Sequence, residues 1–134
     1  MKEICGIKVP VEIKYSEHDE WVSHSLPHRV GVSDFVQDLI GELLFAELPP
    51  VGAEFKKGQE FGALESYLGA RPLISPADLK VVAINDELNN DPTLVNRSPY
   101  GQGWVIEVKL KDPDQVDCLM DAEAYKKSLE SKAL

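Results

Sequence analysis

The sequence predicts a mostly β fold of short antiparallel strands, with a few short helices and one helix near the carboxyl end. Apolar residues alternate or cluster in short runs, which is typical of strands. Nine glycines and nine prolines separate many of these runs, and both residue types favour turns. Near the end of the chain, Val116, Leu119 and Met120 share one apolar helical stripe. A chain of 134 residues has the length of one domain, so we expect residues 1–134 to form a single unit.

The strands follow one another along the chain after an amino-terminal extension over residues 1–12. They are expected around residues 13–15, Trp21, 30–32, 43–48, 61–64, 81–84 and 104–110. In each segment, β-branched or aromatic residues recur between turn-forming residues.

The expected helices are short, apart from the last one. Ser33 or Asp34 can begin a helix over residues 34–39, because a side-chain oxygen there accepts a hydrogen bond from a free backbone N–H. Residues 86–89 suggest a helical turn before a proline. The carboxy-terminal helix is expected over residues 114–130, and the lysines near its end suit the negative pole of a helix.

Charge and hydropathy exclude several classes of partner. Lys and Arg total 14 against 23 Asp and Glu, a formal net charge of −9, which repels the phosphates of nucleic acids. No segment approaches the roughly 18 apolar residues that a membrane span needs, and the amino terminus lacks the pattern of a signal peptide. We therefore expect a cytoplasmic protein that binds neither nucleic acid nor membrane.

The sequence offers no convincing metal or catalytic site. His24 and His28 have a spacing that helical metal ligands use, but Leu26-Pro27 between them prevents a regular helix, which favours a polar hairpin loop. Ser66 has no histidine nearby and no nucleophile motif around it, so its hydroxyl is expected to bond to backbone. Glu65 is expected to be a solvated charge. We predict neither an enzyme nor a metalloprotein.

Ordered motifs nevertheless identify a family over roughly residues 13–127. The runs that carry the resemblance are Y-S-E at 15–17, E-W-V at 20–22, V-G-V-S-D-F-V-Q at 30–37, G-E-L-L-F-A-E-L-P at 41–49, E-S at 65–66, S-P at 75–76, P-Y-G-Q-G-W at 99–104 and L-M-D-A-E-A-Y at 119–125. In order and spacing they resemble the H protein of the glycine cleavage system. The resemblance implies a barrel-sandwich hybrid of the lipoyl-domain type, in which two small antiparallel sheets pack face to face.

The same resemblance implies a lipoyl carrier, but the attachment residue differs. In the family a lysine at a hairpin tip, two residues after the serine of the E-S run, carries lipoate. Here that position is Leu68, which has no amine to acylate, so we expect no lipoate cofactor. The segment after it also departs from the family, in which it is polar and extended, because Gly69, Ala70, Arg71 and Pro72 stand there instead. Pro72 lacks a backbone donor, which predicts that strand pairing is interrupted or confined to a sheet edge.

Two functions from different classes follow. The first is a non-lipoylated binding or scaffold protein that docks on glycine-cleavage or lipoate-handling enzymes. Its candidate docking tip is Glu65, Ser66, Tyr67, Leu68 and Gly69. Tyr67 and Leu68 either stay exposed as an anchor or fold back into the groove that the arm would use.

The second function is a working lipoyl carrier modified at another lysine. Lys56, Lys57 and Lys80 are the candidates that flank the hairpin, since residues 58–79 contain no lysine. A third idea is a small-molecule pocket created by the altered hairpin. The resemblance also implies a monomer whose partners are proteins of the glycine cleavage or a lipoate-dependent system.

Overall fold

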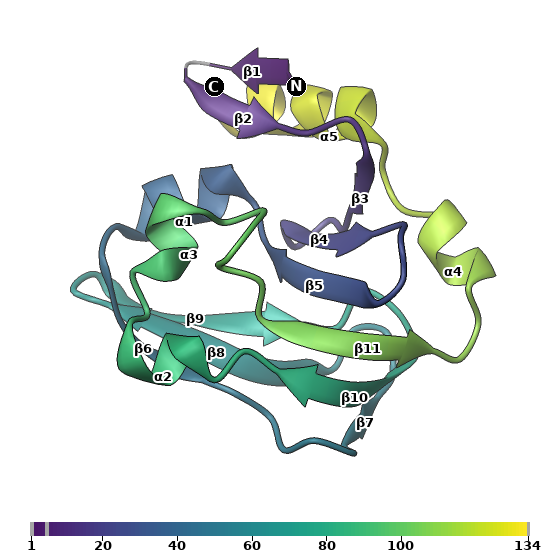
Figure 1. Cartoon of the computed structure of the whole chain (residues 1–134). Coiled ribbons are helices and arrows are strands. Elements are labelled where there is room, and N and C mark those ends of the chain that lie inside the picture. Colours follow the sequence, from purple (N-terminus) through teal and green to yellow (C-terminus); the bar gives the residue numbers. More distant parts are fainter. Residues whose placement is uncertain (1, 5, 134) are drawn as a thin grey trace.

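The computed structural model describes residues 2–4 and 6–133 and shows three antiparallel sheets (Figure 1). The largest has six strands in the order β3-β4-β5-β11-β10-β7. Their bounds are β3 Ile13–Tyr15, β4 Glu20–Ser23, β5 His28–Val32, β11 Ile106–Leu110, β10 Leu79–Ile84 and β7 Glu54–Phe55. The second sheet has the order β6-β8-β9, with β6 Leu43–Glu47, β8 Glu60–Ser66 and β9 Gly69–Ile74. Residues near the amino terminus form a two-stranded sheet of β1 Lys2–Ile4 and β2 Ile7–Val9.

The six-stranded and three-stranded sheets pack face to face around the main core. Val30, Val81 and Ile106 from the first sheet and Leu64 and Leu73 from the second are fully buried in one apolar cluster. Val81 alternates with the exposed residues Lys80 and Val82, as expected when one face of a sheet is solvated, whereas Val30 and Ile106 lie in central strands whose neighbouring residues are buried or half-buried. The predicted mostly β fold with two antiparallel sheets is therefore confirmed.

Short helices cover the edges and ends of the sheets. They are α1 Asp34–Ile40, α2 Glu87–Asn90, α3 Leu94–Arg97, α4 Asp114–Asp117 and α5 Ala122–Ala133. α5 lies beside the β1–β2 sheet, so the described residues nearest the two ends of the chain lie side by side (Figure 1). A second apolar cluster, containing Tyr15, Trp21 and Tyr125, joins α5 to β3 and β4. Among the described residues, every helix is too short or too polar to cross a bilayer.

The expectation of one carboxy-terminal helix over residues 114–130 is wrong, because two helices occupy that region. Met120 leaves the helical path and exchanges two backbone hydrogen bonds of 2.9 Å with Tyr15, which forms an isolated antiparallel bridge. Asp121 then starts a new helix, since its side chain accepts a hydrogen bond from the Ala124 N–H. The backbone of Met120 cannot pair with β3 and belong to a helix at once, so α4 and α5 are separate.

Pro72 lies within β9 without breaking it. It pairs with Ala63 of β8, and pairing continues on both sides of it. β9 is an edge strand of its sheet, where a residue without an N–H costs no ladder hydrogen bond on the open side. Of the two outcomes expected for Pro72, confinement to an edge is the one that the structure shows.

Candidate functional site

The β8–β9 hairpin carries the position at which the family's lysine is expected. Ser66 pairs with Gly69, which leaves Tyr67 and Leu68 as a two-residue loop. Gly69 has a φ of 128°, a conformation that favours glycine. The Leu68 N–H donates to Ser66 Oγ at 3.1 Å, and the Ser66 hydroxyl donates to the Gly69 carbonyl at 3.4 Å. The prediction that the Ser66 hydroxyl bonds to backbone is confirmed.

Both loop side chains are exposed. The exposed fractions of Tyr67 and Leu68 are 74% and 77%, so neither side chain folds back into a groove. The Leu68 side chain lies near Gly41, the residue that follows the last turn of α1. A Cβ atom placed on Gly41 would lie 3.9 Å from Leu68 Cδ1. Glu65, at the base of the loop, is also exposed. The hairpin therefore presents an aromatic and an aliphatic side chain to solvent.

The tip does not fit covalent lipoate. Attachment of lipoate to a protein forms an amide with a side-chain amine, and the aliphatic side chain of Leu68 has no nitrogen. Arg71 is the nearest basic residue along β9, but a guanidinium does not take the place of a lysine amine, and this one is already bonded elsewhere.

Arg71 ties β9 to the turn between β3 and β4. Its Nη2 atom donates to the His18 carbonyl and to Asp19 Oδ2, each at 3.0 Å. The Asp19 side chain is only 6% exposed and also accepts a hydrogen bond of 2.9 Å from the Tyr125 hydroxyl of α5. One buried carboxylate thus connects β9, the β3–β4 turn and α5. The sequence gives no local signal for this contact, because 52 residues separate Asp19 from Arg71.

Glu20 adds a second polar link to the same strand. Its Oε1 accepts a hydrogen bond of 2.8 Å from Ser16 Oγ, and its Oε2 accepts one of 3.2 Å from the backbone N–H of Ile74. Burial raises the pKa of Glu20 from 4.5 to about 7, although the hydrogen bonds from Ser16 and Ile74 and the charge of Arg71 act in the opposite direction. The middle of β9, at Arg71, and its last residue, Ile74, are therefore held by Asp19 and Glu20, where the β3–β4 turn meets β4.

The alternative lysines lie away from the hairpin tip. Lys56 and Lys57 form the turn after β7, and Lys80 is the second residue of β10. In Figure 1, β7 and the start of β10 lie at the lower right, whereas the start of β9 lies at the left. All three lysines are exposed.

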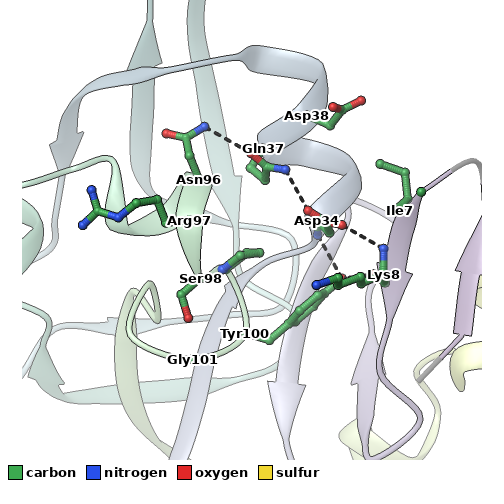
Figure 2. A pocket seen from close by; sticks show the side chains of 12 residues that line it. Ile7, Lys8, Asp34, Gln37, Asp38, Asn96, Arg97, Ser98, Tyr100 and Gly101 are labelled. Carbon is green, nitrogen blue, oxygen red and sulfur yellow. Dashed lines mark hydrogen bonds between the residues drawn. The ribbon is translucent and has the colours of Figure 1, made fainter.

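A polar cavity of about 490 Å³ opens between β2, α1 and the segment from α3 to Gly101 (Figure 2). Asp34 lines this cavity, and its carboxylate accepts hydrogen bonds from the Lys8 backbone N–H and from Gln37 Nε2. The Asp34 N–H in turn donates to the Tyr100 hydroxyl. These groups bind one another and hold the β1–β2 sheet against α1, an arrangement that serves structure rather than catalysis.

The histidine pair lies at the connection between β4 and β5. His24 lies in the loop between β4 and β5, and His28 begins β5, with its Nδ1 atom 2.9 Å from the Ser23 carbonyl oxygen. No group of three or more His, Cys, Asp or Glu side chains among the described residues is placed to hold a metal ion. The predicted polar loop between the two histidines is confirmed.

Comparisons with known proteins match this architecture. A family model described as glycine cleavage H-protein matches residues 13–132. A glycine cleavage system H protein from Symbiobacterium thermophilum is 42% identical over 118 residues, which is 87% of this chain and 92% of that protein. One from Citrobacter koseri is 38% identical over 126 residues, covering 92% and 98% of the two chains.

A solved structure agrees with the sequence matches. The crystal structure of a glycine cleavage system H protein from Mycobacterium marinum superposes with a TM-score of 0.81 at 27% identity. The superposition covers 94% of this chain and 100% of that one. Because the family model spans far more than half of the sequence and includes the β8–β9 hairpin, the chain belongs to the glycine cleavage H-protein family.

Proposed function

We propose that this chain is a non-lipoylated H-like protein that binds glycine-cleavage or lipoate-handling enzymes as a docking or scaffold protein. H proteins are lipoyl carriers rather than catalysts, use covalent lipoate, and interact with the P, T and L proteins of the glycine cleavage system. The observation that carries the proposal is Leu68, an exposed aliphatic residue at the hairpin position where the family has its lysine. A protein that keeps the H-protein fold but lacks the attachment lysine can still dock on the family's enzymes, although it cannot carry a lipoyl arm.

The geometry of the hairpin supports a role in binding. Tyr67 and Leu68 project from a two-residue loop, and an exposed aromatic residue is a frequent anchor in protein interfaces. Arg71 holds the following strand to Asp19, so the loop is presented from a fixed base. A fixed loop loses less conformational entropy on binding than a mobile one.

The alternative is a working carrier that is lipoylated at Lys56, Lys57 or Lys80. Its support is the family membership itself, because H proteins carry lipoate. The positions of these lysines count against it: two lie on another turn and the third lies within a strand. We further propose one domain over residues 1–134, a monomer in the cytoplasm, and no role in binding nucleic acid or membranes.

Intact mass distinguishes the two functions. The protein is coexpressed with a lipoate ligase in medium containing lipoate, and the Symbiobacterium thermophilum relative is coexpressed separately to show that the ligase is active. We expect the unmodified mass for this chain and a lipoyl increment for the relative. A lipoyl increment on this chain would overturn the proposal, and peptide mapping would then identify the modified lysine.

Docking is tested separately by titrating purified P, T and L proteins from the same organism. We expect at least one of them to bind the wild-type chain. Replacing Tyr67 and Leu68 together by serine should weaken that binding by at least about tenfold, which is the loss expected for a central anchor. Unchanged affinity of the double variant would exclude the tip as the anchor.

A further inference from the structure

We propose that the docking surface continues from the hairpin tip along the outer face of the three-stranded sheet, and that it takes a protein with an apolar pocket flanked by lysine or arginine. This inference rests on the proposed function and specifies the partner's chemistry. The outer face consists of Phe45 and Glu47 of β6, Ala63 and Glu65 of β8, and Ala70 and Pro72 of β9.

The strand register places these six residues on one face. Phe45 pairs with Glu65, and Glu65 pairs with Ala70, which forms one row across the sheet. Residues that pair directly across antiparallel strands project to the same side. The next row on this side, two residues further along each strand, contains Glu47, Ala63 and Pro72.

The opposite face of the same sheet is the core face. Ala46 and Leu64 lie in the intervening row and are buried in the main core. Arg71, the third member of that row, reaches Asp19 on the inner side. The outer rows therefore face solvent: Phe45, Ala70 and Pro72 are exposed, and Ala63 is half-buried.

A bulge in β6 enlarges the apolar part of this surface. The pairing between β6 and β8 shifts register between Leu43 and Phe45, so Leu44 is an extra residue in the strand. Leu44 and Phe45 are consecutive and both are about half exposed. Exposed large apolar residues that lie together, here next to Tyr67 and Leu68, are characteristic of interaction sites.

The charges on this surface specify the partner. Glu47 and Glu65 are exposed, and neither forms an ion pair with another described residue. The three strands contain one basic residue, Arg71, and it is bound to Asp19 on the inner face. An apolar surface that carries only negative charge is complementary to an apolar pocket with positive side chains at its rim.

The experiment measures binding of the purified P, T and L proteins to single-site and paired variants, at low and at high salt. Phe45→Ser tests the apolar part of the face. The pair Glu47→Gln and Glu65→Gln tests the charged part without changing side-chain size. At low salt, we expect Phe45→Ser and the glutamate pair each to weaken binding about tenfold. At high salt, the glutamate pair should have a smaller effect, because salt already screens the attraction between the wild-type glutamates and the partner.

Two matched controls lie on other parts of the molecule. Leu26→Ser removes an 82% exposed leucine from the loop between β4 and β5, which lies at the opposite end of the sheets from the hairpin in Figure 1. The pair Asp114→Asn and Asp117→Asn removes the same net charge as the glutamate pair, but from α4. Both controls should bind like the wild type, and all variants are first shown to retain the wild-type unfolding midpoint.

The outcomes separate this inference from the proposed function. If the Tyr67 and Leu68 double variant loses binding while Phe45→Ser and the glutamate pair bind normally, the tip docks alone and the extended surface is wrong. If none of the three enzymes binds the wild-type chain, both proposals fail. Concentration-dependent self-association that Phe45→Ser abolishes, measured by sedimentation, would show that the face meets a second copy and would also overturn the inference.

Discussion

At the scale of single residues, the arrangement around Asp19 explains how the hairpin is held. Asp19 is the one non-glycine residue with a positive φ, 73°, among the described residues, and its carboxylate is almost fully buried. Aspartate tolerates this conformation better than most residues. Its position lets it meet both the Arg71 guanidinium and the Tyr125 hydroxyl. A buried carboxylate is costly unless it is paired, so the three residues depend on one another.

Replacing Arg71 by methionine should therefore destabilise the fold strongly. The variant keeps the aliphatic bulk but leaves the Asp19 charge buried without its cation, which costs roughly 3 kcal/mol in the free energy of unfolding. Arg71→Lys should lower the free energy of unfolding less than Arg71→Met, because an ammonium keeps the positive charge beside Asp19. It should still cost some stability, because an ammonium cannot reproduce the planar contacts of the guanidinium. Urea unfolding measures both.

The control for this change is Arg97→Met, which breaks the exposed ion pair between Arg97 and Asp91. Water solvates both partners of that pair, so its loss should change the unfolding midpoint little. An Arg71→Met variant that unfolds at the same urea concentration as the control would show that the buried ion pair does not stabilise the fold.

Glu20 should make stability depend on pH. Because its folded-state pKa of about 7 lies above the ordinary value of 4.5, folding favours the protonated form. Its stabilising contribution is fully present below about pH 4.5 and is lost as the pH rises to about 7, a decrease of roughly 3 kcal/mol. Glu20→Gln should remove this part of the pH dependence, and its amide oxygen can still accept the hydrogen bond from the Ile74 N–H.

The measurement is the free energy of unfolding of wild type and Glu20→Gln from acidic to mildly alkaline pH. Glu65→Gln, which changes an exposed acid on β8, serves as the control and should follow the wild-type curve. Parallel curves for wild type and Glu20→Gln would contradict the assignment of this titration to Glu20.

At the scale of elements, α5 depends on its first turn and on one aromatic contact. The helix is polar for most of its length, so few of its residues can hold it by burial. Tyr125 stacks on Tyr15 with ring centroids 4.3 Å apart, and Leu129 is also buried. Asp121 caps the amino-terminal end through its hydrogen bond to the Ala124 N–H. The cap and the stack are the two features that set where the helix begins and which way it faces.

Asp121→Ala should lower the free energy of unfolding by about 1 kcal/mol, the usual cost of losing an N-cap. Asp121→Asn should be close to wild type, because asparagine also accepts the N–H bond. Amide hydrogen exchange in the first turn of α5 should rise in the alanine variant alone. Equal exchange in both variants would show that the side chain at position 121 does not cap the helix.

The β8–β9 hairpin is the element that decides whether lipoylation can be restored. Leu68→Lys places an amine at an exposed tip, but Gly69, Arg71 and Pro72 still differ from the polar segment expected in the family. We expect a lipoate ligase to modify this variant less completely than the Symbiobacterium thermophilum relative under the same conditions. Intact mass gives the modified fraction, and full modification of Leu68→Lys would show that the flanking residues do not matter.

At the scale of the whole molecule, local patterns predicted most of the strands. Alternating or clustered apolar residues predicted β5, β6, β8, β10 and β11, because such patterns indicate a strand with at least one buried face. The short elements β1, β2, β7 and α3 were not among the predicted elements, since segments so short carry too little periodicity. β9 was not among the predicted strands either, because its sequence, G-A-R-P-L-I, does not alternate apolar and polar residues. The order of the motifs predicted the family, and the comparisons confirm it.

The sequence by itself determined the fold class, the family and the absence of an amine at position 68, because each depends on residue type and spacing along the chain. Tertiary structure alone decided the pairing of Arg71 with Asp19, the burial of Glu20, the interruption between α4 and α5, and the exposure of Tyr67 and Leu68. Each of these features depends on which distant segments pack together. The hydroxyl of Tyr125 meets Asp19 across 106 residues, and such a contact forms only when β4 and α5 are brought against the same core.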